Sequence, residues 1–144
     1  MVMGVVCPII MMFFFPGKPS LSAFWETPAV SLFILMNVVT ASFFYTLENW
    51  RLPAILLILT TALPVTYFGQ IHNILAVLFF LSAGYAVVIS RRWSWVGILF
   101  IPAIIVSMKS LLWAELIAID VICLYHALAL YKREEIMKKR NENI

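Results

Sequence analysis

Residues 110–131 read SLLWAELIAIDVICLYHALALY, an apolar stretch that contains no Lys or Arg. A helix needs about 20 mainly apolar residues to cross the roughly 30 Å hydrocarbon core of a bilayer. This stretch is therefore long enough for one membrane span.

The composition of the whole chain favours the same environment. The 144 residues are 64% hydrophobic and 12% charged, and the mean hydropathy is +1.02. Soluble domains have about 45–50% apolar and about 25% charged residues. Cys7 and Cys123 are too few for a secreted disulfide scaffold. The net charge of +3 comes mostly from the C-terminal tail, so we expect no nucleic-acid partner.

Charged and turn residues divide the chain into six apolar runs. They cover residues 2–15, 28–47, 52–69, 73–90, 93–108 and 110–131. Unpaired backbone groups are costly in lipid, so each run is predicted to be helical. The sequence thus predicts an all-α, polytopic transmembrane bundle over residues 1–131. A charged tail, 132–144, follows as a helix extension or a disordered end.

Local signals refine these helices. Thr27 and Pro28 indicate an N-cap followed by a proline at the first helical position. Pro64 and Pro102 lie inside their runs and are predicted to kink the third and fifth helices. The first run is short, spanning about 21 Å. We interpret it as a retained helix because no basic residue precedes it. A signal sequence cleaved near residues 20–23 is the alternative.

Basic residues set the expected orientation. With the tail in the cytoplasm, one side of the membrane holds Arg51, Arg91, Arg92, Lys132, Arg133, Lys138, Lys139 and Arg140, and the other holds Lys18 and Lys109. The positive-inside rule then places both termini in the cytoplasm. The Trp residues at positions 25, 50, 93, 95 and 113 fall near predicted span ends, where indole rings are favoured. A bacterial cytoplasmic membrane is the preferred location, and a eukaryotic plasma or organelle membrane stays open.

Polar residues near the outer ends of the runs suggest a first site. His72 opens the fourth run, Glu115 lies about one turn inside the sixth, and Glu26 precedes the second. Together they predict a polar pocket at the outer face. The alternative for Glu115 is that it complements a helix N-terminus near the headgroups.

Ionisable residues deeper in a span usually face the bundle interior. Asp120 lies near the middle of the sixth run, level with Asn37 of the second, and we predict that it pairs with Asn37 or with a threonine of the third run. Such a pair either serves a function or holds helices together. His126 lies toward the cytoplasmic end, where it either serves the same site or reaches the interface.

Several chemistries are not expected. The chain has no HExxH motif, Gly-rich phosphate loop or nucleophile elbow. Two His residues near opposite surfaces suit neither a three-His zinc site nor a haem. We therefore expect no metal or cofactor, and we favour a protein that is not an enzyme.

The layout resembles the six-helix membrane proteins that include the damage-regulated autophagy modulators and the Golgi proteins of GPI-anchor remodelling. Three short segments carry this resemblance: PSLSAFWETPAVSLFILMN (19–37), IHNILAVLFF (71–80) and WAELIAID (113–120). The chain has a shorter first helix and minimal loops, and Asp120 has no counterpart that can be carried over. The resemblance implies a protein that handles or senses lipid, with Glu26, His72 and Glu115 at its outer face.

Three functions follow. The first is lipid binding or handling through the outer pocket. The second is a non-catalytic accessory role in a larger membrane complex, with other subunits or further copies as partners. The third is proton- or ion-coupled transport that uses Asp120 as the titrating carboxylate.

Overall fold

The computed structural model describes residues 2–90 and 94–142, and every regular element in those ranges is helical. The α-helices are α1 (Val2–Phe14), α2 (Val30–Tyr45), α3 (Arg51–Ala62), α4 (Val65–Ile89), α5 (Phe100–Ser107) and α6 (Leu111–Glu142). Three 3₁₀ helices join them: η1 (Leu21–Glu26), η2 (Glu48–Trp50) and η3 (Ser94–Leu99). Arg91, Arg92 and Trp93, which entered the orientation and aromatic arguments, lie outside the described residues. The all-helical fold class is confirmed.

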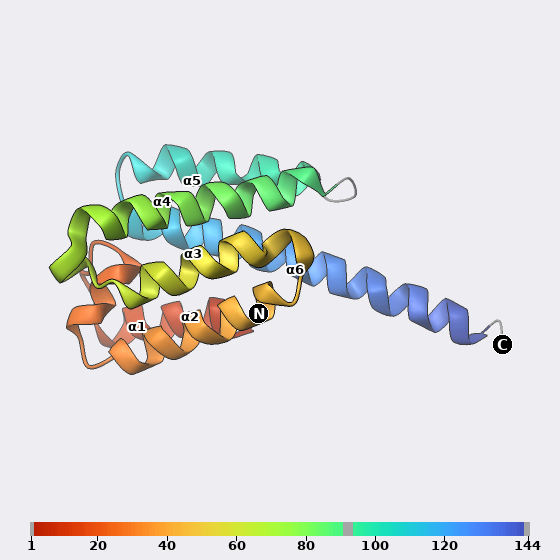
Figure 1. The fold of residues 1–144 in the computed structure, drawn as a ribbon, viewed down its shortest axis with the longest axis horizontal. Coiled ribbons are helices and arrows are strands. Elements are labelled where there is room, and N and C mark those ends of the chain that lie inside the picture. The colour runs from red at the N-terminus through yellow and green to blue at the C-terminus, as the bar shows by residue number, and fades with distance from the viewer. Residues whose placement is uncertain (1, 91–93, 143–144) are drawn as a thin grey trace.

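The helices lie side by side in one bundle (Figure 1). Helix α2 packs between α1 and α3, α4 packs on α3, and α6 contacts α1, α4 and α5. The C-terminal part of α6 projects well beyond the other helices (Figure 1). Helix α6 therefore packs against both the first and the fifth helix of the bundle.

The boundary between α3 and α4 lies earlier than predicted. We expected a third helix through Gly69 and a fourth that begins near His72. Instead α3 ends at Ala62, and Leu63 is extended with φ −110° and ψ 90°. A residue that precedes proline is disfavoured in the helical region, so Pro64 causes a turn here rather than a kink. Helix α4 then starts at Val65, and a kink at Phe68, with φ −126° and ψ 28°, separates its first turn from the rest of the helix.

The fifth predicted helix is only half α-helical. Residues 94–99 form η3, and α5 begins at Phe100. Pro102 is therefore in the first turn of α5, where a missing backbone N–H costs little, and not in the middle of a helix. Gly97 allows η3 to approach α4 closely, because a Cβ at this position would lie 2.6 Å from Val88 Cγ2.

The predicted tail continues α6 as a helix through Glu142. Glu135 forms ion pairs with Lys132, one turn before it, and with Lys139, whose Nζ lies 3.0 Å from Glu135 Oε1. Pairs at these spacings stabilise exposed helices slightly. They favour the helical form of the charged segment.

The segment before α2 is held by side-chain and backbone hydrogen bonds. Thr27 Oγ1 donates to the Phe24 carbonyl at 2.8 Å and accepts from the Ala29 N–H at 3.2 Å. The predicted N-cap at Thr27, with Pro28 as the first helical residue, is wrong: α2 begins at Val30 and its N-cap is Ala29, without a side-chain cap. Thr27 instead holds the turn that leads into α2. The Leu112 N–H donates to the Pro19 carbonyl at 3.0 Å. This bond ties the same segment to the start of α6.

The buried apolar residues form two clusters. The smaller cluster joins α1, η1 and the first half of α2, with Met11 and Phe24 at its centre. The larger cluster joins the second half of α2 to α3, α4, η3 and α6. Trp50 belongs to this second cluster and is only 2% exposed. Its indole therefore packs inside the protein, in η2 between the end of α2 and the start of α3.

Two helices, Val65–Ile89 and the Leu111–Arg140 part of α6, are long and apolar enough to cross a membrane. Helices α1 and α2 and the η3–α5 segment are apolar but shorter. Large apolar side chains are exposed along nearly every helix, including Phe13, Leu35, Leu81 and Ile104. These features favour association with a membrane.

Candidate functional site: a cavity between α2 and α6

The three residues predicted to form an outer pocket bond to three different neighbours. Glu115 is buried, and its Oε2 accepts the Leu21 N–H at 2.6 Å. This N–H is the first of η1, where no helical acceptor exists. Glu115 therefore caps η1. This agrees with the alternative interpretation, in which Glu115 complements the N-terminus of a helix.

Glu26 lies at the other end of η1. It is exposed, and its Oε1 accepts a hydrogen bond from Thr66 Oγ1 of α4 at 2.9 Å. The two carboxylates thus anchor the same 3₁₀ helix, Glu115 to α6 and Glu26 to α4.

His72 is 1% exposed and lies in α4, shortly after the deviation at Phe68. Its Nδ1 lies 2.7 Å from the Leu63 carbonyl oxygen. A carbonyl oxygen only accepts hydrogen bonds, so Nδ1 carries the proton and donates a hydrogen bond to Leu63, the residue after α3. His72 therefore holds the α3–α4 turn. The described contacts do not join it to Glu26 or Glu115.

The predicted pair of Asp120 with Asn37 does not form. Asp120 is exposed on α6, and Asn37 is buried within α2 at 8% exposure. The threonines of α3 bond to their own helix: Thr60 donates to Leu56 and Thr61 donates to Leu57. The hydropathy pattern places Asp120 near the middle of the run 110–131. It does not predict the direction in which the side chain points.

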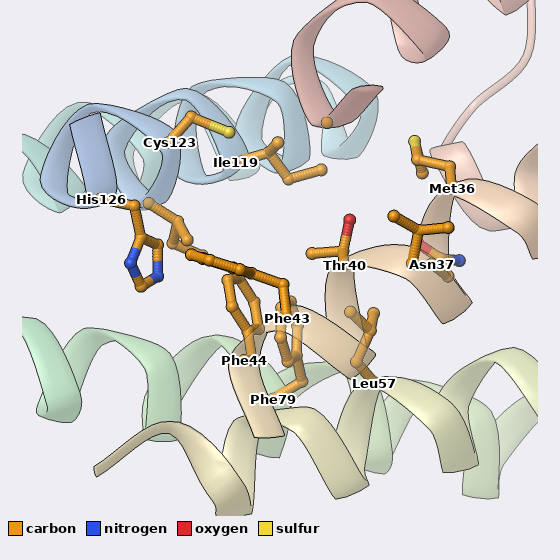
Figure 2. A pocket seen from close by; sticks show the side chains of 13 residues that line it. Met36, Asn37, Thr40, Phe43, Phe44, Leu57, Phe79, Ile119, Cys123 and His126 are labelled. Atoms are coloured by element: carbon orange, nitrogen blue, oxygen red, sulfur yellow. The ribbon is translucent and has the colours of Figure 1, made fainter. Parts of the chain in front are cut away.

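A cavity of about 220 Å³ lies between α2 and α6, where the two apolar clusters meet. Figure 2 shows Ile119, Cys123 and His126 of α6 on one side and Met36, Asn37 and Thr40 of α2 on the other. The wall on the side of α3 and α4 is formed by Phe43, Phe44, Leu57 and Phe79. Gly4 of α1 also lines the cavity, and a Cβ there would lie 3.2 Å from Cys123 Sγ.

The burial of the lining residues shows which part of the cavity is accessible. Met36, Leu57 and Phe79 are buried and form its floor. Val39 is 43% exposed, and Thr40 and Cys123 are half-buried. The exposed side of the cavity thus lies between α2 and α6, beside the start of α1.

Three polar groups in this largely apolar wall lack partners. The side chains of Asn37 and Thr40 make no hydrogen bond within the described part of the chain. His126 is 3% exposed, and its Nε2 is buried without a partner there. More than about 90% of buried polar groups in proteins are hydrogen-bonded. A largely apolar cavity that is lined by a few polar groups is typical of a ligand site.

Aromatic rings fix the position of His126. Its ring stacks on Phe44 with centroids 5.0 Å apart, and the centroid of Trp50 lies 4.3 Å away. Phe43 and Tyr125 meet it edge-on. The sequence identified Asn37 and His126 as polar residues inside helices, but it missed Thr40, whose hydroxyl belongs to an ordinary helical sequence.

The site carries no indication of metal chemistry. Among residues 2–90 and 94–142, no three His, Cys, Asp or Glu side chains lie close enough together to hold a metal ion. Cys123 and His126 lie one turn apart on α6, and the other lining groups are apolar, amide or hydroxyl.

Comparisons with protein-family models, with curated proteins and with solved structures find no match to this chain. The geometry of the site is therefore the basis for a functional assignment.

Proposed function

We propose that this chain is a small integral membrane protein that binds lipid in the cavity between α2 and α6. The observation that carries the proposal is the polar lining of that cavity: His126 Nε2 is buried without a partner among the described residues, and the side chains of Asn37 and Thr40 make no hydrogen bond there. They suit the carbonyl or hydroxyl group of a lipid, while the surrounding rings and aliphatic side chains suit its apolar part.

The size of the cavity limits what it holds. Pockets for drug-sized ligands measure about 300–1,000 Å³, and this one is smaller, at about 220 Å³. It therefore accommodates one end of a lipid molecule. The remainder passes the exposed side at Val39 and lies along the outside of the bundle.

Membrane placement is part of the proposal. The two long apolar helices and the exposed apolar side chains support it. We propose six spans, with α1 and α5 short, and both termini in the cytoplasm according to the distribution of Lys and Arg. A bacterial cytoplasmic membrane is the location that we propose. The resemblance to the autophagy-modulator and GPI-remodelling family stays a prediction that agrees with lipid binding.

The proposed site differs from the outer pocket that the sequence suggested. Glu26, His72 and Glu115 each hold a local part of the fold through a hydrogen bond. We therefore assign them positioning roles at one end of the bundle and place the lipid site at Asn37, Thr40 and His126. Transport through Asp120 receives no support from this site, because Asp120 does not line the cavity.

Native mass spectrometry of the protein extracted gently from its membrane tests the proposal. We expect wild type to retain one lipid per chain. Thr40→Trp places a large ring at the accessible side of the cavity and is expected to reduce the lipid-bound fraction at least tenfold. The matched control is Val38→Trp, because Val38 is 43% exposed and does not line the cavity. Retention of the lipid by Thr40→Trp, or its equal loss from both variants, would refute the proposed site.

A second variant separates loss of binding from loss of folding. Asn37→Leu removes the unpaired amide without a large change of volume, and replacement of an unsatisfied buried polar group by an apolar one is neutral or stabilising. We expect the melting temperature of the lipid-free protein to stay the same or rise and the bound lipid to fall. Unchanged lipid binding would show that Asn37 does not contact the lipid.

A further inference from the structure

Asp120 lies on an exposed face of α6. The side chains of this face are spaced three, four or seven residues apart, which places them on one side of a helix. They are Trp113, Asp120, Leu124, Ala127 and Tyr131, and all are exposed. Asp120 is the only charged residue among them, and it lies near the middle of the apolar run 110–131.

Within residues 2–90 and 94–142, no side chain or backbone group is bonded to this carboxylate. Asp120 makes no hydrogen bond or ion pair within the described part of the chain. It does not line the α2–α6 cavity either. An ionisable side chain in mid-span normally pairs with another polar group, because lipid solvates it poorly. A mid-span carboxylate directed out of the bundle therefore points to a partner outside the chain.

Charge complementarity identifies the chemistry of that partner. The described basic residues lie at the ends of the helices or in the tail, for example Arg51, Lys109 and Lys132. The imidazole of His126 is buried at 3% exposure. A second copy would thus bring another carboxylate to this depth, and none of its described basic side chains would be exposed there. Two like charges repel each other, so the second copy is a poor match.

We propose that the α6 face around Asp120 docks a membrane-spanning helix of another protein that carries a Lys or Arg side chain near mid-span. The basic group pairs with Asp120, and apolar residues of the partner helix pack on Leu124 and Ala127. This inference rests on the proposed membrane placement of α6. It does not depend on the lipid cavity, which lies on a different face of the helix.

The test uses a defined helix in place of the unidentified partner. The full chain is reconstituted into phosphatidylcholine vesicles with a synthetic poly-leucine transmembrane peptide that has a central lysine and a benzophenone beside it. A peptide with leucine in place of the lysine is the control. We expect the lysine peptide to crosslink to residues 117–127 at least tenfold more than the leucine peptide. Asp120→Leu should remove the difference, and Asp120→Glu should retain most of it.

The outcomes separate this inference from the membrane proposal. If carbonate at high pH releases the chain from the vesicles, α6 is not a membrane span and both proposals fail. If the chain stays in the vesicles but crosslinks equally to the two peptides, only the docking inference fails. Equal crosslinking of the lysine peptide to wild type and to Asp120→Leu would also overturn it, because the peptide would then bind without the carboxylate.

Discussion

Trp50→Ala is expected to destabilise the protein by about 3–5 kcal/mol, the usual cost of deleting a buried tryptophan side chain. Trp50 is 2% exposed, and its ring centroid lies 4.8 Å from that of Phe44 and 5.5 Å from that of Tyr125. Its removal leaves a void beside His126 and the larger apolar cluster. Thermal unfolding in detergent micelles, followed by circular dichroism, measures the loss.

Trp113→Ala provides the matched control for this substitution. It deletes the same side chain from α6, where Trp113 is 55% exposed. We expect a change within about 0.5 kcal/mol, as for surface positions in general. Equal destabilisation by the two substitutions would contradict the placement of Trp50 inside the bundle.

Glu115→Ala is expected to cost about 1–3 kcal/mol, because it leaves the buried Leu21 N–H without an acceptor. Glu115→Gln keeps an oxygen at the same place and should cost less than about 1 kcal/mol. Hydrogen exchange gives a local readout: the Leu21 amide should exchange faster in the alanine variant and remain protected in the glutamine variant.

This pair of variants distinguishes capping from a role in a ligand pocket. Faster exchange at Leu21 in both variants would show that the bond needs the carboxylate itself and that a neutral oxygen does not replace it. Unchanged exchange in the alanine variant would show that η1 is held by other contacts, such as the Leu112–Pro19 hydrogen bond.

The sequence predicted the helical class well, because long apolar runs leave little alternative to helices. It placed the break between α3 and α4 at the wrong position. The polar segment around Gln70 and His72 suggested a loop, whereas the apolar pair Leu63–Pro64 makes the turn. The backbone constraint of proline outweighs local polarity here, since polar residues fit inside a helix and a residue before proline rarely does.

The candidate site was predictable only in part. Asn37 and His126 stood out as polar residues in apolar runs, and both line the cavity. The predicted pairing of Asp120 with Asn37 was wrong. Residues at equal depth on two helices meet only if their side chains point toward each other. The distance of Gly4 from Cys123, and with it the cavity beside α1, depends on packing between distant segments. The hydropathy pattern along the chain does not predict that packing.

Photolabelling with a lipid that carries a diazirine in its acyl chain, close to the carbonyl group, tests the central claim most directly. The lipid is incorporated into membranes that contain the full chain, irradiated, and located by mass spectrometry of peptides. Lipid bound in the cavity should concentrate the label in residues 36–44 and 119–126, and Thr40→Trp should remove this concentration. Equal labelling of exposed outer positions such as Ile101, Ile104 and Ile105 of α5, unaffected by Thr40→Trp, would contradict it.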